Sequence, residues 1–376
     1  MLYYIGFYTD KGNPENRKSV LSATNKMKYI IDTIDKIGIK QKIVCCGMTL
    51  DKKSYKSSIQ KVSDNISLKK FRTLGKKNIL TKVLDMFFSK IQLICYLLKN
   101  VKSNDIMLVY HSPAYINEIA FVKRIKKCKL ILEIEEIYAD VSGDKALKEK
   151  EISLCKIADA FIFPTDMLNG VVNINNKPYV TIHGTYQVEN NLVNKLDDTI
   201  IHVVYAGTFD PRKGGAVAAV AASEFLDSKY HIHILGFGSE KDKGNLLEEI
   251  EKVAKISECK VTYDGLISGE DYIRFIQRCH IGLSTQNPSA AFNATSFPSK
   301  ILSYMSNGLR VVSIRIPAIE TSAIGKHMYY YDKQTPEEIT KAIMSVDMND
   351  GYDGRKIISE LDKDFSKDIK ALLGEK

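Results

Sequence analysis

The chain has 376 residues, of which 44% are hydrophobic and 26% charged, and its formal net charge is +9. This length suits two domains, and the composition excludes a disordered or low-complexity protein. No apolar run reaches the roughly 18 residues of a membrane-spanning helix. The seven cysteines form no Cys-x-x-Cys pair, so we expect buried thiols, a cytoplasmic protein and no metal site.

Strand-like and helix-like segments alternate through the first half of the chain. The first apolar run, Tyr3–Tyr8, is short and is followed by Asp10 and Lys11, which indicates a strand and not a signal peptide. This alternation predicts a Rossmann-like α/β domain with a parallel sheet over residues 1–186. The elements expected after the first strand are helix Val20–Ile37, strand Gln41–Cys46, strand Asp105–Tyr110, helix Ile116–Lys126, strand Lys129–Ile134, helix Lys145–Ile157 and strands Ala160–Phe163 and Tyr179–Ile182.

Positive charge is concentrated in the first half of the chain. Residues 1–150 carry an excess of 14 positive charges, and the remainder carries an excess of 5 negative charges. The surplus is dense over Lys69–Lys82, next to a long, largely apolar helix expected over Ile79–Leu98. A solvated basic face and a contact with anionic lipid headgroups both explain this pattern. We expect no nucleic acid, because neither a base-stacking pattern nor a recognition helix is present.

A polar run marks the transition to a second domain. Residues Gln187–Thr199 lack apolar periodicity and form the expected linker. The strand that starts at Ile201 then leads into a loop that presents Arg212 and Lys213. Such a loop at the end of a strand is a candidate phosphate site, although a surface turn would have the same residues.

Two further strand ends carry glycine or lysine. One strand ends in Gly236 and Gly238, which would let a ligand approach the backbone. Farther on, a short helix begins near Ser299, carries Lys300 and stops at Gly308. The free N–H groups of its first turn and the lysine indicate an anion site, and an ordinary capped helix is the alternative.

These segments together resemble the C-terminal half of GT-B glycosyltransferases, most of all glycosyltransferase family 4. The resemblance implies an α/β protein of two Rossmann-like domains with parallel sheets facing across a cleft. The second domain would span residues 200–345, and a helical tail over 346–376 would pack back on the first. The motifs are Gly207, Lys213-Gly214, Gly236-Phe-Gly238, Val261-Thr-Tyr-Asp-Gly265, and Phe297-Pro-Ser-Lys300 followed by Gly308-Leu-Arg-Val-Val312.

The resemblance implies transfer of a sugar from a nucleoside-diphosphate donor, UDP most of all, to a saccharide or lipid-linked acceptor. Retention at the anomeric carbon and a role in surface-polysaccharide assembly are also implied. Fixed cations and N–H groups would hold the charge that develops on the leaving diphosphate, so no metal or cofactor is expected. Two alternatives stay open: a nucleotide-sugar epimerase of GT-B fold, and a catalytically silent subunit that binds glycan or protein. The oligomeric state is also open, with a homo-oligomer among the alternatives.

The resemblance also assigns residues to the donor. Lys213 and Lys300 would hold the diphosphate as catalytic cations. Many family members carry two glutamates around this helix, at positions occupied here by Thr295 and Ser303, so a serine hydroxyl would replace the carboxylate that contacts the ribose. The full set of expected donor-binding residues is Gly207, Arg212, Gly238, Tyr263, Gly265, Leu266, Thr295, Ser299 and Ser303.

In the first domain, Glu135 and Glu136 occupy the place where family members often carry a His-Asp pair beside the donor sugar. A carboxylate there could bind a sugar hydroxyl or accept the proton of the acceptor, so both are candidate catalytic residues. Acidic residues at the start of a helix are the ordinary alternative. The acceptor-side residues expected are Gly12, Asn16, Arg17, His111 and His183.

Overall fold

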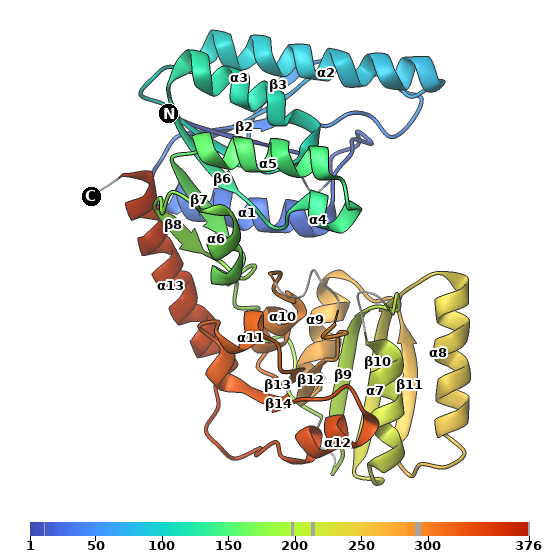
Figure 1. The fold of residues 1–376 in the computed structure, drawn as a ribbon. Coiled ribbons are helices and arrows are strands. Elements are labelled where there is room, and N and C mark those ends of the chain that lie inside the picture. The colour runs from blue at the N-terminus through green and yellow to red at the C-terminus, as the bar shows by residue number, and fades with distance from the viewer. Residues whose placement is uncertain (11, 197–198, 212–214, 290–294, 375–376) are drawn as a thin grey trace. The chain divides into compact units, whose positions relative to one another are not determined.

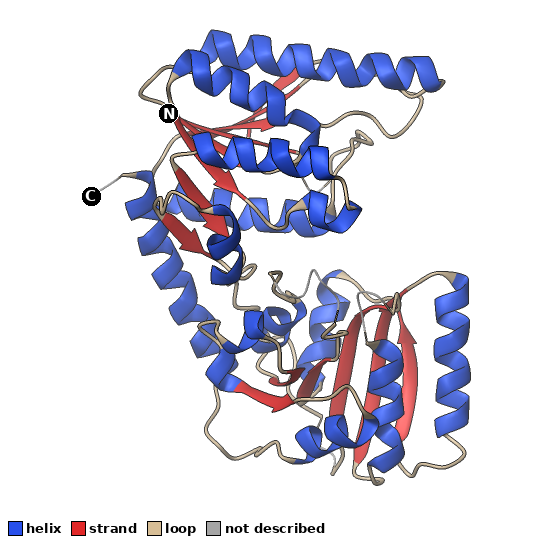
Figure 2. Cartoon of the chain, viewed as in Figure 1, coloured by secondary structure: helices blue, strands red, loops and turns tan. Residues whose placement is uncertain are grey.

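The computed structural model describes residues 1–10, 12–196, 199–211, 215–289 and 295–374. The chain divides into two compact units, Met1–Thr185 with Asp364–Lys376, and Tyr186–Lys363 (Figure 1). Each unit is an α/β structure built on its own sheet (Figure 2). The expected fold class, two α/β units with parallel sheets, is therefore confirmed. None of the described helices is long and apolar enough to cross a membrane.

The sheet of unit 1 has eight strands in the order β3-β4-β2-β1-β5-β6-β7-β8. All neighbours pair in parallel except β3 and β4, which form an antiparallel pair. This pair was not predicted, because β3 is exposed throughout and shows no apolar alternation. The strands are β1 Leu2–Gly6, β2 Gln41–Cys45, β3 Ser58–Lys61, β4 Ile66–Lys70, β5 Ile106–Tyr110, β6 Lys129–Glu133, β7 Ala160–Phe163 and β8 Tyr179–Thr181.

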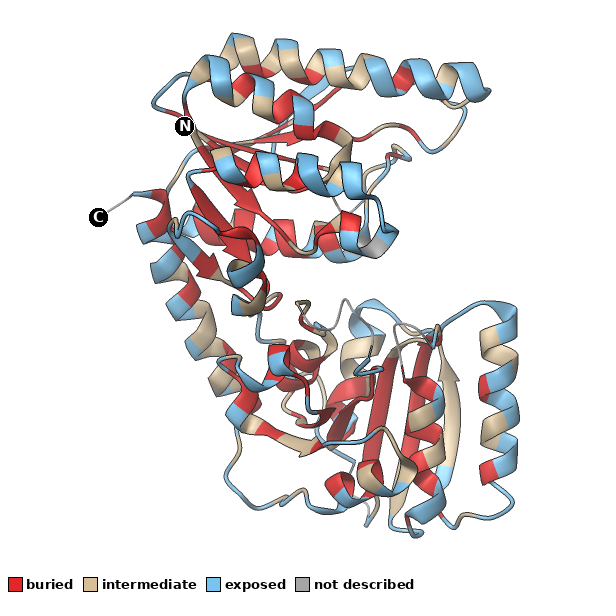
Figure 3. Cartoon of the chain, in the orientation of Figure 1, coloured by how far each residue is buried: buried red, intermediate tan, exposed pale blue. Residues whose placement is uncertain are grey.

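Helices cover both faces of this sheet, and the central strands are buried (Figure 3). On one face, Tyr3 and Ile5 of β1 belong to a core cluster with Leu97 of α2 and Ile119 of α3. On the other face α1 packs so closely that a Cβ on Gly6 would lie 2.7 Å from the Met27 side chain. The helices are α1 Leu21–Lys36, α2 Ile79–Asn100, η1 Pro113–Tyr115, α3 Ile116–Lys126, α4 Tyr138–Ser142, α5 Lys145–Ile157 and α6 Asp166–Val172.

The C-terminal helix α13, Gly354–Leu373, begins in unit 2 and ends in unit 1. Within unit 1, the Phe365 ring stacks on Tyr29 at a centroid distance of 5.7 Å. The Lys129 ammonium donates a hydrogen bond to the Leu372 carbonyl, at 2.6 Å. The last turns of the tail are thus fixed to unit 1 by an aromatic contact and a partly buried hydrogen bond.

The sheet of unit 2 has six parallel strands in the order β11-β10-β9-β12-β13-β14. The chain builds outward from β9 to β11 and then returns to the other side of β9 with β12. This reversal creates a topological switch point at the carboxyl ends of β9 and β12, the position where open parallel sheets bind ligands. The strands are β9 Ile201–Thr208, β10 Tyr230–Phe237, β11 Lys260–Gly265, β12 Ile281–Ser284, β13 Arg310–Ile314 and β14 Met328–Tyr331. The helices are α7 Ala216–Ala221, η2 Ala222–Phe225, α8 Glu240–Val253, α9 Gly269–Arg278, α10 Lys300–Ser306, α11 Pro317–Glu320, η4 Gly325–His327 and α12 Pro336–Met344.

The polar run that was expected to be a linker is bonded to unit 2 over its described part. The side chain of Gln277, which is buried, accepts a hydrogen bond from the Leu192 N–H at 2.9 Å and donates to the Asn190 carbonyl at 2.6 Å. The Glu189 N–H donates to the Ser306 carbonyl at 3.3 Å. These contacts use the backbone of the run, so its side-chain pattern did not indicate them.

Candidate functional site

The switch point of unit 2 is built from backbone in close contact. Gly236 has a φ of +139°, and a Cβ there would lie 1.8 Å from the carbonyl oxygen of Gly207. A Cβ on Gly215 would lie 1.5 Å from the Thr285 carbonyl oxygen, and the Thr285 hydroxyl donates to the Gly215 carbonyl at 2.9 Å. Only glycine fits at these two positions, and the loops after β9 and β12 are held together there.

Lys300 places its ammonium at this switch point. Its Nζ lies 4.1 Å from the centroid of the Tyr205 ring and 2.9 Å from the position that a Cβ on Gly207 would take. Desolvation lowers the pKa of Lys300 from 10.5 to about 8. In the described part of the chain Lys300 forms no ion pair, so a cation held over an aromatic ring is available to an anion.

Tyr205 fixes both ends of the loop that follows β9. Its hydroxyl donates to the Thr208 carbonyl at 2.8 Å and accepts from the Gly215 N–H at 3.2 Å. The two basic residues that were predicted in this loop, Arg212 and Lys213, lie outside the described residues. The predicted convergence of Lys213 and Lys300 on one diphosphate therefore stays a prediction.

Tyr304 holds α10 in place and was not singled out from the sequence. Its hydroxyl accepts a hydrogen bond from the Ala206 N–H at 2.8 Å, and its ring occupies the space left by Gly282, where a Cβ would lie 2.3 Å from ring carbons. Tyr304 thus ties the helix that carries Lys300 to β9 and β12. A tyrosine in a short helix is usually a core residue and attracts no notice in the sequence. The only sequence signal for this packing is the glycine at position 282, which leaves room for the ring.

The remaining predicted donor residues have varied environments. The Ser303 hydroxyl shares a hydrogen bond with the Tyr272 hydroxyl at 3.1 Å, so a ribose hydroxyl would have to exchange with Tyr272. Ser299 is exposed at the start of α10 and makes no capping hydrogen bond with its side chain. Thr295 is half-buried and has contacts of its own. Ser303 thus lies within α10, whereas Thr295 precedes this helix.

Tyr263 and its neighbours form the edge of the sheet beside the switch point. The Tyr263 hydroxyl donates to the Gly236 carbonyl at 3.4 Å, and its ring packs edge-on against Phe209 at 5.7 Å. A Cβ on Gly238 would lie 2.8 Å from the Phe209 side chain, so packing alone requires glycine there. After Gly265, which has a φ of +88°, the Leu266 side chain is 69% exposed. Tyr263 is therefore partly a packing residue, whereas Leu266 is open to a ligand.

In unit 1, three acids lie at and just after the carboxyl end of β6: Glu133 is buried, whereas Glu135 and Glu136 are half-buried. Glu135 forms an ion pair with Lys26, with 2.6 Å between the carboxylate oxygen and the ammonium nitrogen. The same ammonium donates a hydrogen bond to the Ile182 carbonyl at 3.0 Å. Glu133, two residues earlier, is fully buried; desolvation first, and then the charge of Glu135, raise its pKa to about 8. The Tyr4 hydroxyl donates to one Glu133 oxygen, and the other oxygen has no partner among the described residues.

Glu133 was missed by the sequence analysis, which assigned the chemistry to Glu135 and Glu136. The signal that could have found it is an acid within the apolar strand Lys129–Glu133, where a solvated acid is not expected. Glu136 is half-buried and engaged with other groups. The acids therefore differ: the pKa of Glu133 is raised, whereas Glu135 forms an ion pair with Lys26.

His111 and His183 are structural in unit 1. His111 is 1% exposed, and its Nε2 lies 2.7 Å from Glu151, which also accepts from the N–H groups of Tyr138 and Ala139 at the start of α4. His183 is buried, its Nδ1 lies 2.7 Å from the Pro164 carbonyl, and burial lowers its pKa, so the ring is neutral. Both were expected to touch the acceptor, and that contact stays a prediction.

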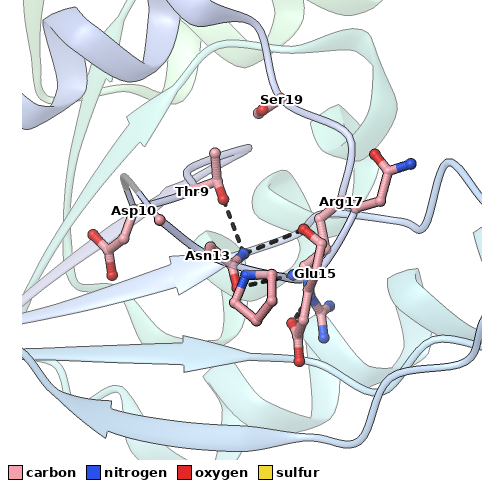
Figure 4. A pocket seen from close by; sticks show the side chains of 9 residues that line it. Thr9, Asp10, Asn13, Glu15, Arg17 and Ser19 are labelled. Carbon is pink, nitrogen blue, oxygen red and sulfur yellow. Dashed lines mark hydrogen bonds and ion pairs between the residues drawn. The ribbon is translucent and has the colours of Figure 1, made fainter.

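A pocket of about 360 Å³ lies in the loop after β1 (Figure 4). Gly12 and Asn16 line it and are exposed, and the Asn13 amide at its centre donates to Thr9 at 3.0 Å. Arg17 also lines this pocket but is 4% exposed. Its guanidinium donates to the Gly47 and Phe71 carbonyls at 3.2 and 2.8 Å and pairs with Glu15 at 2.6 Å. These bonds hold Arg17 within the loop, and its expected contact with the acceptor stays a prediction.

The comparisons with known proteins agree with this architecture. Residues 201–347, the segment that carries the glycine and lysine motifs, match the family described as Glycosyl transferases group 1. No curated protein matches the chain. Similar solved structures include a UDP-forming trehalose-phosphate synthase from Burkholderia xenovorans in complex with glucose-6-phosphate, with a TM-score of 0.69 at 9% identity over 99% of both chains.

Two further similar structures have the same fold over their whole length. A sucrose-phosphate synthase from Thermosynechococcus elongatus has a TM-score of 0.70 at 13% identity and covers 99% of this chain and 97% of its own. Anabaena HepE, in complex with UDP and glucose, has a TM-score of 0.65 at 12% identity over 99% of both chains. At these identities the likeness establishes the GT-B fold. The narrower assignment to family 4 stays a prediction.

Proposed function

We propose that this protein is a GT-B glycosyltransferase that binds a UDP-sugar at the switch point of unit 2 and transfers the sugar to a saccharide acceptor. The observation that carries the proposal is the ammonium of Lys300, which has no ion-pair partner among the described residues and lies next to Gly207 and over the Tyr205 ring. Lys300 is half-buried with a desolvated ammonium, and a desolvated cation without a counter-ion is costly unless a ligand anion neutralises it. The family match over residues 201–347 supports a glycosyl donor as that ligand.

The chemistry requires stabilisation of the leaving diphosphate. Breaking the bond between the anomeric carbon and the phosphate oxygen leaves negative charge on that oxygen, and a fixed cation in a dry site stabilises it. Lys300 would provide that charge, with Lys213 as the second cation and Arg212 as its competitor. The glycines at the switch point, Gly207, Gly215 and Gly236, would let the backbone lie close to the phosphates. Catalysis without a metal remains part of this proposal.

We infer that the acidic group of unit 1 acts on the acceptor side. Glu135 is accessible but paired with Lys26, whereas Glu133 is buried with a pKa of about 8. A carboxyl group that titrates near neutral pH suits general acid or base work better than an ordinary glutamate. Glu135 would accept the hydrogen bond of a sugar hydroxyl, and Lys26, which pairs with it, would hold it in place.

One experiment separates this function from the alternatives. A panel of UDP-sugars is incubated with and without saccharide, sugar-phosphate and lipid-linked acceptors, and products are identified by mass spectrometry. We expect glycosylated product and free UDP only when an acceptor is present, with the anomeric configuration of the donor retained. An epimerised donor without acceptor would indicate the epimerase. Absence of UDP binding at millimolar concentration would indicate the silent subunit.

The rate should depend on pH through Lys300. In the free enzyme its ammonium has a pKa of about 8, so the positive charge is lost as the pH rises through that value. We therefore expect kcat/KM for the UDP-sugar to fall above about pH 8. Lys300→Met should remove this alkaline limb, and Glu133→Gln, which removes a buried carboxyl group whose pKa is also about 8, should keep it. A limb that persists in Lys300→Met would contradict the assignment.

We also propose that unit 1 attaches to an anionic membrane surface at the cytoplasmic face, through helix α2. Much of the helix is exposed (Figure 3), and many of its exposed side chains are apolar. Ile79, Leu80 and Phe87 are 83%, 66% and 58% exposed, and such a group of exposed large apolar side chains is unusual on the surface of a soluble protein. The other exposed apolar side chains of α2 are Val83, Leu84, Met86 and Ile91.

Basic residues adjoin this apolar face. Arg72, Lys77 and Lys82 are exposed, whereas the one acid of α2, Asp85, is buried and accepts the Leu74 N–H at 2.6 Å. Apolar side chains with cations around them match the headgroup region of an anionic bilayer. The expected patch over Lys69–Lys82 needs one correction, because Lys70 is buried and donates to Asn13 at 3.1 Å.

Lipid binding can be measured with vesicles of phosphatidylcholine and phosphatidylserine. The double variant Ile79→Ser/Ile91→Ser should reduce binding at least fivefold, because each buried side chain of this size contributes about 1.5–3 kcal/mol. The matched control is Ile59→Ser/Ile256→Ser, which changes two isoleucines of similar exposure, 67% and 60%, outside α2. Equal loss in both double variants, or no binding by the native protein, would exclude the proposed surface.

A further inference from the structure

Four of the seven histidines of the chain gather in unit 2 on strands that are far apart in the sequence. His202 of β9 and His231 of β10 are direct neighbours in the sheet register. His233 follows two residues after His231, so its side chain lies on the same face of the sheet. His280 precedes β12, and its Nδ1 accepts the His202 N–H at 3.0 Å. The group lies toward the amino ends of the strands, whereas Gly207 and Gly236 lie at their carboxyl ends.

The rings are close enough to share a ligand. The His202 Nδ1 and the His233 Nε2 are 2.9 Å apart, and the ring centroids of His231 and His233 are 3.8 Å apart. One nitrogen from each of His202, His231 and His233 lies within 4.8 Å of the other two. Two facing imidazole nitrogens at 2.9 Å must share one proton, and a metal ion can replace that proton.

The surroundings of the trio resemble the support of a metal ligand. The His233 Nδ1 lies 3.1 Å from an Asp264 carboxylate oxygen, which also accepts the Thr262 hydroxyl at 2.8 Å. A carboxylate on the far nitrogen fixes the tautomer of a histidine and directs its other nitrogen toward a metal. Phe275 of α9 packs edge-on against His233 at 5.2 Å, and His202 and His233 are buried. His231 is half-buried, which leaves a route from solvent.

The geometry points to a transition-metal site formed by His202, His231 and His233, with Asp264 as the positioning carboxylate and Zn²⁺ as the ion it would take. Three imidazoles plus a water form a common tetrahedral zinc site, with Zn–N distances of about 2.0–2.1 Å. Small rotations of the rings would bring the three nitrogens to that spacing. Bound Zn²⁺ would clamp β9 to β10, which is a stabilising role separate from the sugar-donor chemistry. The cysteine pattern gave no indication of this site because no cysteine takes part.

Zinc binding to chelator-treated full-length protein, measured by titration against a chromogenic chelator, tests the inference. We expect one Zn²⁺ per chain, a higher melting temperature with zinc, and an X-ray absorption spectrum with nitrogen and oxygen ligands. His231→Gln should weaken binding at least tenfold. The matched control, His327→Gln, changes a half-buried histidine of the same unit that lies outside the cluster and should bind as the native protein does.

Asp264→Asn keeps the shape of the site and serves if His231→Gln does not fold. It should weaken zinc binding about 10-fold or more, as loss of a supporting carboxylate does at other sites. UDP binding should be the same in all folded variants, which separates this site from the donor site. The inference would be overturned by sulfur ligands in the spectrum or by equal zinc affinity in His231→Gln. It would also be overturned if the chelator-treated protein did not bind one Zn²⁺ per chain at a 100-fold excess of zinc.

Discussion

Lys300→Met is expected to lower kcat/KM for the UDP-sugar by about 10- to 150-fold. A charge-assisted contact to the diphosphate contributes roughly 1.5–3 kcal/mol, and Lys300 has no other charged partner among the described residues. Methionine keeps an unbranched stem of similar length, so it removes the charge while leaving the packing against Tyr205. Steady-state kinetics with the donor found in the product screen measure the effect.

The control for this variant is Lys341→Ala, which removes a lysine of the same unit. Its side chain is 74% exposed on α12 and pairs with Glu338, so the rate should stay within twofold of the native enzyme. If the variant at Lys300 also retained the native rate, the lysine would not contact the reacting phosphate. Circular dichroism of both variants excludes unfolding as the cause.

Gly236→Ala is expected to abolish UDP binding and to lower the free energy of unfolding by about 1–3 kcal/mol. The native φ of +139° is unfavourable for alanine, and the new methyl group would lie 1.8 Å from the Gly207 carbonyl oxygen. The ends of β9 and β10 would have to separate, which moves the backbone that surrounds Lys300. Calorimetric titration with UDP and urea denaturation give the two readouts.

The matched control is Gly244→Ala, on helix α8 of the same unit. A Cβ there meets no heavy atom within 4 Å, and alanine favours a helix by about 0.5–1 kcal/mol over glycine. This variant should therefore be slightly more stable than the native protein and bind UDP normally. Similar losses in both variants would mean that the close contact between Gly207 and Gly236 is not what shapes the site.

Much of the fold could be predicted because its signals are local. Buried strands such as Ala160–Phe163 are short apolar runs, and the glycines at the ends of β9 and β10 occur where the backbone must be approached closely. The β3–β4 pair could not be predicted, since β3 is polar and exposed and its pairing depends on a neighbour already in the sheet. Local sequence patterns thus identify buried strands and helices better than they identify the strand pairing at the edge of a sheet.

The site could be predicted only where backbone requirements specify residues. Gly207 and Lys300 were identified and do lie together. Arg17 was assigned to the acceptor, but its partners Gly47 and Phe71 are 30 and 54 residues away, so its burial is a property of the tertiary fold. The same is true of Glu133, whose partner Tyr4 belongs to another strand, and of His202 with His233. Side-chain partners of this kind cannot be read from spacing along the chain.

The proposed function requires the diphosphate of the donor to lie against Lys300, and the most direct measurement compares the binding of UDP with that of uridine. Calorimetric titration of the native protein should give much tighter binding of UDP, because uridine lacks the phosphates. In Lys300→Met this preference should shrink at least tenfold, while the weak affinity for uridine should stay the same. An unchanged preference for UDP in the variant, or no binding of UDP by the native protein, would contradict the account.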